Sequence, residues 1–155
     1  MTHTLMILIG IPASGKTTFR KTLHGYKVVC PDEIRKQIFH TIFNKKVEPL
    51  VWKCVRLQVL THLRNRQNVV LDATNLVSPY RTRFLKIAEK YKARTYAIIF
   101  DTPLRVCVRR NLRRKDPVDP KVIQKMHYQF ERLMNDPSIL YEEGFDGVKF
   151  QNHRI

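Results

Sequence analysis

Residues 10–17 read GIPASGKT and decide the fold of this chain. They match the pattern G-x-x-x-x-G-K-[ST] in full, after an apolar run at residues 5–9 and before a helix predicted over residues 15–23. Glycines allow backbone torsions that other residues resist, so the amide hydrogens of such a loop converge on phosphate groups. The helix that follows adds its positive N-terminal end. The strand, loop and helix together predict a phosphate-binding loop.

The side chains of this loop and of a second strand end predict the cofactors. Lys16 is expected to reach the β- and γ-phosphates of a nucleoside triphosphate, and the Thr17 hydroxyl to coordinate magnesium. Asp72 follows an apolar run at residues 69–71, where phosphate-loop enzymes place an acidic residue that orients the magnesium shell. Ala73 comes next, so the pair of acids typical of many ATPases is missing. We expect ATP or another nucleoside triphosphate, bound with Mg²⁺.

Short apolar runs alternate with longer amphipathic segments, which is the pattern of βαβ units and a parallel sheet. We predict a single α/β domain over residues 1–155, of P-loop NTPase or kinase-like type, with four to five parallel strands and helices on both faces. Strands are predicted at residues 5–9, 27–30, 69–71, 95–100 and 148–150. Helices are predicted at residues 15–23, 31–43, 50–66, from 78 onward with a hydroxyl cap from Ser78, at 104–115 and at 120–134.

The chain is strongly basic. It contains 29 Lys and Arg residues against 13 Asp and Glu residues, which gives a net charge of +16. Repulsion between so many positive charges does not stabilise a fold. Such an excess usually serves to bind a polyanion, more often a nucleic acid than a membrane surface. A general solubility charge is the alternative. No apolar stretch approaches the ~20 residues that a membrane span needs, and residues 5–9 are too few for a signal peptide, so a cytoplasmic protein is expected.

A second set of polar residues follows the strand predicted at residues 27–30. Asp32 lies at the N-terminus of the next helix, where the helix dipole keeps its carboxylate ionised. An ionised aspartate beside a γ-phosphate can accept the proton of an attacking hydroxyl group. Arg35 lies one turn further on and is suited to bind an acceptor phosphate through its fork of donors. A plain helix cap is the alternative role for Asp32.

The segment at residues 104–115 predicts a basic helix. Its apolar face is expected to hold Leu104, Cys107, Val108 and Leu112, and the other face carries Arg105, Arg109, Arg110, Arg113 and Arg114. These arginines repel one another unless phosphates arrive, and a lid that closes on a γ-phosphate needs donors on a mobile element. We therefore predict a helical lid over approximately residues 103–120, with Arg114 as its catalytic member. A solvated arginine stripe is the alternative.

With these motifs the chain resembles the P-loop kinases that include the 5′-hydroxyl polynucleotide kinases, among them the kinase domains of phage and bacterial end-healing enzymes. The matching elements occur in the family's order over nearly the whole chain: GIPASGKT, Asp32 with Arg35, VLDATN at 70–75, FDTP at 100–103, the arginine helix through Arg114, Val118 with Val122, Ile123 and Met126, and EGFD at 143–146. Ala13 departs from the pattern, because the family usually has glycine there. Phosphatase and ligase signatures are missing, so a stand-alone kinase domain, phage- or virus-encoded in some members, is expected.

The resemblance implies roles for individual residues. Asp32 would be the general base, Arg35 would engage the 3′-phosphate of the acceptor, Arg114 would contact the transferring phosphate and Arg110 would lie against the donor nucleobase. The predicted catalytic residues are therefore Lys16, Asp32, Arg35 and Arg114. The predicted nucleotide-binding residues are Gly10, Pro12, Ala13, Ser14, Gly15, Lys16, Thr17, Thr18 and Arg110, and the predicted metal ligands are Thr17 and Asp72.

These expectations favour an ATP-dependent kinase that phosphorylates the 5′-hydroxyl end of RNA or DNA. Two alternatives stay open. A small-molecule kinase of similar fold, acting on a sugar, an antibiotic or a nucleotide, would not need a net charge of +16. Against a nucleic-acid-binding ATPase without phosphotransfer stands Asp32 at the acceptor position.

Overall fold

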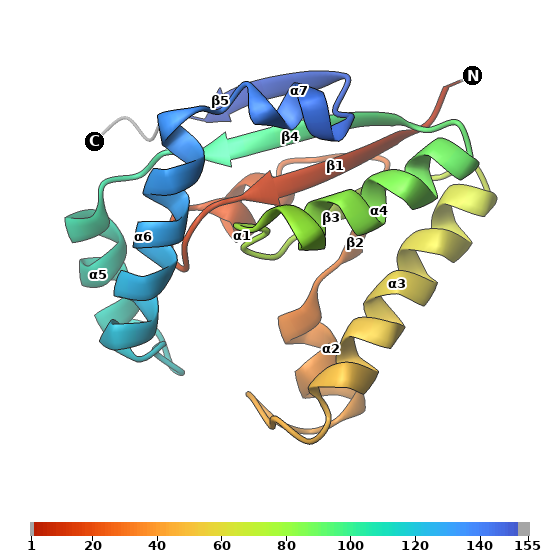
Figure 1. Ribbon diagram of the computed structural model, residues 1–155. Coiled ribbons are helices and arrows are strands. Elements are labelled where there is room, and N and C mark those ends of the chain that lie inside the picture. The colour runs from red at the N-terminus through yellow and green to blue at the C-terminus, as the bar shows by residue number, and fades with distance from the viewer. Residues whose placement is uncertain (1, 152–155) are drawn as a thin grey trace.

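Five parallel strands form one sheet in the order β2-β3-β1-β4-β5 (Figure 1). In the computed structural model, which describes residues 2–151, the strands are β1 (Thr4–Ile9), β2 (Tyr26–Val29), β3 (Asn68–Leu71), β4 (Arg94–Phe100) and β5 (Gly147–Gln151). β1 lies at the centre and pairs in register with both neighbours, so that Ile7 is opposite Leu71 on one side and Ala97 on the other. The predicted α/β class and all five predicted strands are confirmed.

Seven helices connect the strands of the described residues 2–151. They are α1 (Lys16–Arg20), α2 (Pro31–Ile38), α3 (Glu48–Arg64), α4 (Ser78–Lys90), α5 (Leu104–Leu112), α6 (Pro120–Asn135) and α7 (Ile139–Glu143). None of them is long and apolar enough to cross a membrane.

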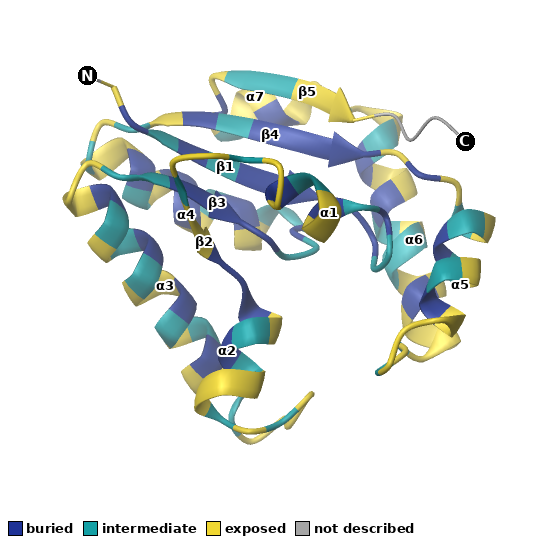
Figure 2. Cartoon of the chain, turned by 180° about the vertical axis from the view of Figure 1, so that it is seen from behind, coloured by how far each residue is buried: buried dark blue, intermediate teal, exposed yellow. Residues whose placement is uncertain are grey.

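The two faces of the sheet are covered unequally. One face packs against the buried sides of α3, α4, α6 and α7, through residues such as Val55, Phe84, Ile123 and Leu140. On the other face Leu8, Val70, Ile98 and Phe100 form a small cluster, to which α1 contributes Phe19. Figure 2 shows the molecule from the side of this second face, with α1 beyond the end of β1. Helices on both faces were predicted correctly. The larger core lies on the face that α3, α4, α6 and α7 cover.

Several helix ends differ from the predictions, and α3 runs over Glu48–Arg64 rather than over residues 50–66. α2 ends at Ile38 rather than at residue 43, because the chain turns at His40, whose φ of 53° is left-handed. α1 is shorter than predicted at both ends, and α5 ends at Leu112 rather than at residue 115. Ser78 begins α4 but makes no capping hydrogen bond, since Val77 occupies the cap position.

The predicted apolar face of the basic helix, α5, was partly wrong. In α5 the buried position belongs to Asn111 and not to Leu112, whose residue exposure is 70%. The Asn111 amide accepts a hydrogen bond from the Val118 nitrogen at 2.9 Å and donates to the Val118 oxygen at 2.8 Å. In α6 Ile123, Phe130 and Leu133 are buried, whereas Val122 and Met126 line a cleft. Asn111 therefore ties the end of α5 to the segment before α6.

The phosphate-loop segment is fixed to the strands around it by hydrogen bonds. The Gly10 nitrogen donates to the Thr74 oxygen at 3.1 Å, and the Asn75 side chain donates to the Leu8 oxygen at 2.8 Å. A Cβ atom on Gly10 would lie 2.6 Å from the Ser14 hydroxyl, so only glycine fits there. Asn75 adopts a left-handed φ of 49°, which confirms that it shapes the turn after β3.

A buried ion pair supports this turn from behind. Arg81 in α4 donates to both carboxylate oxygens of Glu143 in α7, at 2.8 and 2.6 Å, and also to the backbone oxygen of Asn75 at 3.0 Å. The Arg81 and Glu143 side chains are 3% and 6% exposed. The pair therefore connects α4, α7 and the turn that positions the phosphate loop.

We expect Arg81→Met to lower the free energy of unfolding by roughly 3–5 kcal/mol, because it leaves the Glu143 carboxylate buried without a partner. Combining it with Glu143→Leu should recover a large part of that loss, since no buried charge then remains. Urea denaturation of both variants measures the effect. Arg83→Met, at an exposed arginine of the same helix, is the control and should stay within about 0.5 kcal/mol. A double variant no more stable than Arg81→Met would contradict the expectation.

Candidate active site

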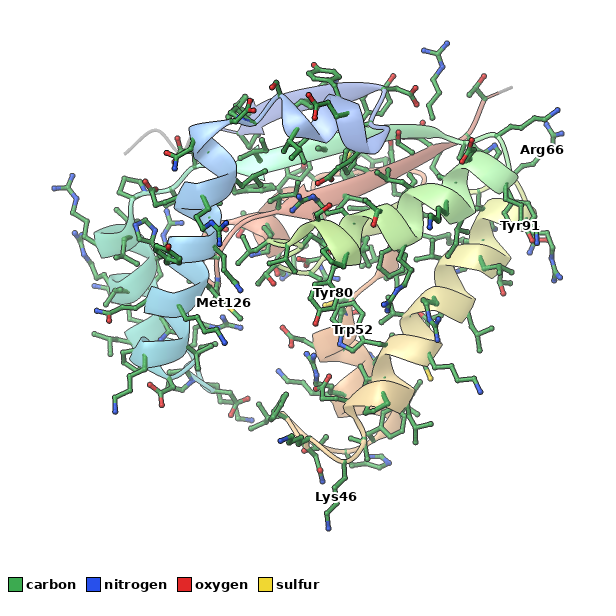
Figure 3. The ribbon with its side chains drawn as sticks, viewed as in Figure 1. Lys46, Trp52, Arg66, Tyr80, Tyr91 and Met126 are labelled. Carbon is green, nitrogen blue, oxygen red and sulfur yellow. The ribbon has the colours of Figure 1, made fainter. Side chains whose placement is uncertain are left out.

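A cleft of about 1320 Å³ opens at the carboxyl ends of the strands. Its walls are the phosphate loop and α1 on one side, α2 and the start of α3 on a second, and the segment from α5 to α6 on a third. Figure 3 shows side chains from α3, α4 and α6 reaching toward the space between these elements. The cleft exceeds the roughly 300–1,000 Å³ usual for a small-molecule site, so it has room for a nucleotide and a second substrate.

The sequence-predicted site residues meet in this cleft. Its lining includes Pro12, Ala13, Ser14, Gly15, Lys16, Thr17, Thr18, Asp32, Arg35, Asp72, Arg110 and Arg114. Gly10 lies beneath the loop, packed against Ser14 and Phe100. Residues from four separate stretches of the chain are thus brought together, and their individual roles remain predictions.

Two positive φ angles shape the phosphate loop, 63° at Ala13 and 106° at Gly15. Glycine adopts such angles without strain, whereas a residue with a Cβ atom pays roughly 1–2 kcal/mol. The Arg110 side chain donates to the Ala13 oxygen at 3.3 Å, and the Thr102 hydroxyl donates to the Ser14 oxygen at 2.8 Å. The strained turn at Ala13 is therefore held in place from α5 and from the end of β4.

Lys16 lies inside the curve of the loop. Its ammonium group donates to the Gly10 oxygen at 2.9 Å, to the Ile11 oxygen at 2.8 Å and to the Ser14 hydroxyl at 3.4 Å. Burial lowers the pKa of Lys16 from 10.5 to about 8, although the nearby Asp72 carboxylate acts in the opposite direction. The group that is predicted to hold the phosphates is therefore easily deprotonated above neutral pH.

Asp72 connects the end of β3 to α1. Its carboxylate accepts a hydrogen bond from the Thr17 hydroxyl at 3.1 Å and lies 3.1 Å from the Arg20 Nε atom. Burial raises the pKa of the Asp72 carboxyl, against the lowering influence of Lys16 and Arg20. Arg20 also pairs with Glu33 at the start of α2. It was missed by the sequence analysis, although its place one turn after Lys16 and Thr17 puts it on the same side of the helix.

Thr17 and Asp72 offer two neighbouring oxygen ligands of the kind that Mg²⁺ prefers. The described residues hold no group of three or more His, Cys, Asp or Glu side chains that could bind a metal ion without help. Magnesium is commonly held by one or two protein oxygens together with substrate phosphates and water. The residues present fit that mode.

Asp32 and Arg35 form an ion pair at the mouth of the cleft, with 2.7 Å between Arg35 Nη1 and Asp32 Oδ1. Glu48 at the start of α3 holds the other edge of the guanidinium, at 2.6 and 3.1 Å, and was not anticipated from the sequence. The Asp32 side chain is 64% exposed, and Arg35 is 14% exposed. Asp32 makes no capping contact, because Cys30 is the cap residue of α2. The cap interpretation of Asp32 is therefore excluded.

The basic helix divides into two sets of arginines. Arg110 and Arg114 line the cleft, whereas Arg105, Arg109 and Arg113 are exposed on other parts of the surface. Lys36 in α2 lies 3.9 Å from Asp116, in the segment that follows α5. This contact joins two walls of the cleft at its mouth.

Comparison with known proteins identifies a family and several similar sequences. A family model described as an AAA domain matches residues 5–133. A protein of Autographa californica nuclear polyhedrosis virus, named as a bifunctional polynucleotide kinase/RNA ligase, is 28% identical over an alignment that covers 84% of this chain and 21% of the viral protein. The L-seryl-tRNA(Sec) kinase of Methanococcus maripaludis is 25% identical, over 82% of this chain and 52% of that protein.

Among solved structures, a chain in the structure of the Pnkp1/Rnl/Hen1 RNA repair complex superposes with a TM-score of 0.73 at 26% sequence identity. The match covers 86% of this chain and 46% of that chain. The present chain thus spans about a fifth to a half of these relatives.

We expect nucleotide binding to take up protons at alkaline pH. Above about pH 8 most of the free protein has a neutral Lys16, whereas phosphate binding favours the ammonium form. The affinity for ATP should therefore not depend on the protonation of Lys16 below pH 7. Above pH 8 it should decrease with rising pH, by up to about tenfold per pH unit, because binding then requires the uptake of a proton. Calorimetry at pH 8.5 in buffers of different ionisation enthalpy measures the uptake. Lys16→Arg, which stays charged, should abolish it, and equal uptake in that variant would assign the proton to another group.

We expect Ala13→Gly to stabilise the protein by about 0.5–1 kcal/mol, because the relief of a left-handed alanine exceeds the entropy that glycine adds to the unfolded chain. Ala13→Val should destabilise it, since a β-branched residue is worse at this φ. Urea denaturation without nucleotide compares the two. A loss of stability in Ala13→Gly would show that the turn at Ala13 is not strained.

Proposed function

The chain belongs to the AAA domain family, and from this we propose that it is an ATP-dependent kinase that transfers the γ-phosphate to the 5′-hydroxyl end of a polynucleotide. The observation that carries the proposal is the position of the Asp32 carboxylate. It lies in the same cleft as the phosphate loop, on a separate wall, and is held there by Arg35. Arg35 beside it is suited to bind an acceptor phosphate, which an attacking water does not carry.

The residues of the cleft suit the two halves of the reaction. The amides of residues 13–18 and the Lys16 ammonium would hold the β- and γ-phosphates of ATP. Thr17 and Asp72 would hold Mg²⁺, which supplies charge neutralisation to the phosphates when bound. Arg110 would lie against the donor, since it is already fixed to the loop at Ala13.

The transfer itself balances with these groups. Asp32 would accept the proton of the 5′-hydroxyl group as its oxygen forms a bond to the γ-phosphorus, while the bond to the β-phosphate oxygen breaks and ADP leaves. Arg114 is exposed at the edge of the cleft and would stabilise the charge that develops on the transferring group. Arg35, fixed on one edge by Glu48, would bind an acceptor phosphate with its remaining donors.

A polynucleotide is the acceptor that fits best. The charge of +16 favours a polyanion. The volume of the cleft exceeds what one nucleotide needs. The names of the viral and Methanococcus relatives give a polynucleotide and a seryl-tRNA as acceptors, and both contain nucleic acid.

We expect the protein to transfer label from γ-labelled ATP to RNA and DNA oligonucleotides that have a 5′-hydroxyl end. Asp32→Ala should lower kcat by roughly 10²–10⁴-fold, the range of a general base, and leave the Kd for ATP within about threefold. Glu89→Ala, at an exposed acid of α4, is the control and should transfer at the wild-type rate.

Three outcomes would count against the proposal. Full transfer by Asp32→Ala would remove this residue from the mechanism. Transfer to a sugar or a free nucleoside, with an oligonucleotide neither labelled nor competing, would indicate a small-molecule kinase. ATP hydrolysis stimulated by oligonucleotides that stay unlabelled would indicate an ATPase.

For a polynucleotide acceptor, the logarithm of the binding affinity should fall with the logarithm of the salt concentration, with a slope of about 0.7 per single-strand phosphate that is neutralised.

A further inference from the structure

The end of the cleft away from the phosphate loop is apolar and takes no part in the chemistry described above. Its lining includes Ile42, Phe43, Trp52, Val122 and Met126. Ile42 and Phe43 are 59% and 65% exposed, so this end of the cleft is open to solvent. An apolar surface inside a cleft that otherwise binds phosphates calls for a ligand with an apolar face.

Trp52, which lines this apolar end, contacts a second aromatic residue, Tyr80, that lies behind the lining. Trp52 in α3 and Tyr80 in α4 lie with ring centroids 5.4 Å apart and planes inclined by 32°. Trp52 packs in part against the main core, which fixes its ring, while Tyr80 is 43% exposed. Figure 3 shows the two rings side by side, with Met126 of α6 across the space from them.

The position of this apolar end relative to Asp32 suits a nucleobase. Trp52 lies one helical turn after Glu48, the residue that holds Arg35 against Asp32. An acceptor with its 5′-hydroxyl group at Asp32 points its sugar and base away from the phosphate loop, along the wall made by α2 and α3. Nucleobases stack on aromatic side chains regardless of sequence, because every base has a π-face.

We propose that Trp52, supported by Tyr80, stacks on a nucleobase at the 5′ end of the acceptor strand and so selects polynucleotides over acceptors that lack a base. The identity of the acceptor rests on the proposed function. The stack itself is a binding property that does not require phosphate transfer. Arg35 and Lys36, which both line the cleft, would hold the phosphates of the same strand.

The sequence provides a direct probe, because Trp52 is the single tryptophan of the chain. A stacked base quenches indole fluorescence, so titration with a short 5′-hydroxyl oligoribonucleotide should quench the emission of the wild-type protein. The same oligonucleotide with abasic sugars at its 5′ end retains the phosphates and should bind with little quenching. Quenching by ATP alone, with none from the oligonucleotide, would place the donor base at Trp52 and overturn the proposal.

Substitutions of the two aromatic residues test how much the stack contributes to binding of the oligonucleotide. Trp52→Leu keeps apolar bulk against the core but removes the stacking surface, and should raise KM for the oligonucleotide about tenfold, within the range of one base–aromatic stack. KM for ATP should be unchanged. Tyr80→Leu should raise the oligonucleotide KM by a smaller factor. Tyr128→Leu is the matched control, because this exposed tyrosine of α6 neither lines the cleft nor pairs with Trp52.

The two proposals fail in distinguishable ways. Base-dependent quenching without any label transfer would leave the stacking site standing and remove the kinase assignment. Label transfer with equal quenching by normal and abasic strands, and with wild-type KM in Trp52→Leu, would leave the kinase standing and overturn the stacking site. Unchanged urea denaturation of Trp52→Leu confirms that a rise in KM is not a loss of folding.

Discussion

The arrangement of the cleft depends on the backbone hydrogen bonds that fix residues 10–15 at the end of β1. Gly10 is bonded to the turn after β3, and Ser14 to the end of β4. The loop is thereby stretched between the two strands that flank β1, and its left-handed torsions at Ala13 and Gly15 persist because both ends are held. The predicted catalytic groups surround this loop in the cleft, so its anchoring contributes to the geometry of the whole site.

Much of this could be predicted from the sequence, and the reasons are local. The inner strands β1, β3 and β4 contain continuous apolar runs, as expected for strands buried on both faces, whereas the edge strands β2 and β5 are partly exposed. The loop is fixed by its glycines and by Lys16. The prediction for Leu112 failed, and the burial of Asn111 was missed, because a helical wheel ranks side chains by polarity. It cannot show that the Asn111 amide would find the backbone of Val118 and be satisfied in the interior.

The missed residues have a common cause. Arg20 and Glu48 are charged residues on helices, where the usual expectation is exposure to solvent. Their partners, Asp72 for Arg20 and Arg35 for Glu48, lie in other elements and become neighbours only when the sheet and helices assemble. Pairs of this kind orient predicted catalytic groups, and tertiary structure alone makes them visible. The roles of the individual site residues are likewise not decided by sequence pattern.

Helix α1 connects the phosphate loop to the packing of the less covered face of the sheet. Phe19 of α1 packs edge-on against Phe100 of β4, with ring centroids 5.4 Å apart, over the smaller cluster of the second face. The same helix starts at Lys16 and carries Thr17. A ligand that binds the beginning of α1 therefore also holds this helix against the second face of the sheet. Because the ligand binds the native state, the free energy of unfolding rises with ligand concentration. Resistance to heat and to proteases becomes a property of the liganded protein more than of the free chain.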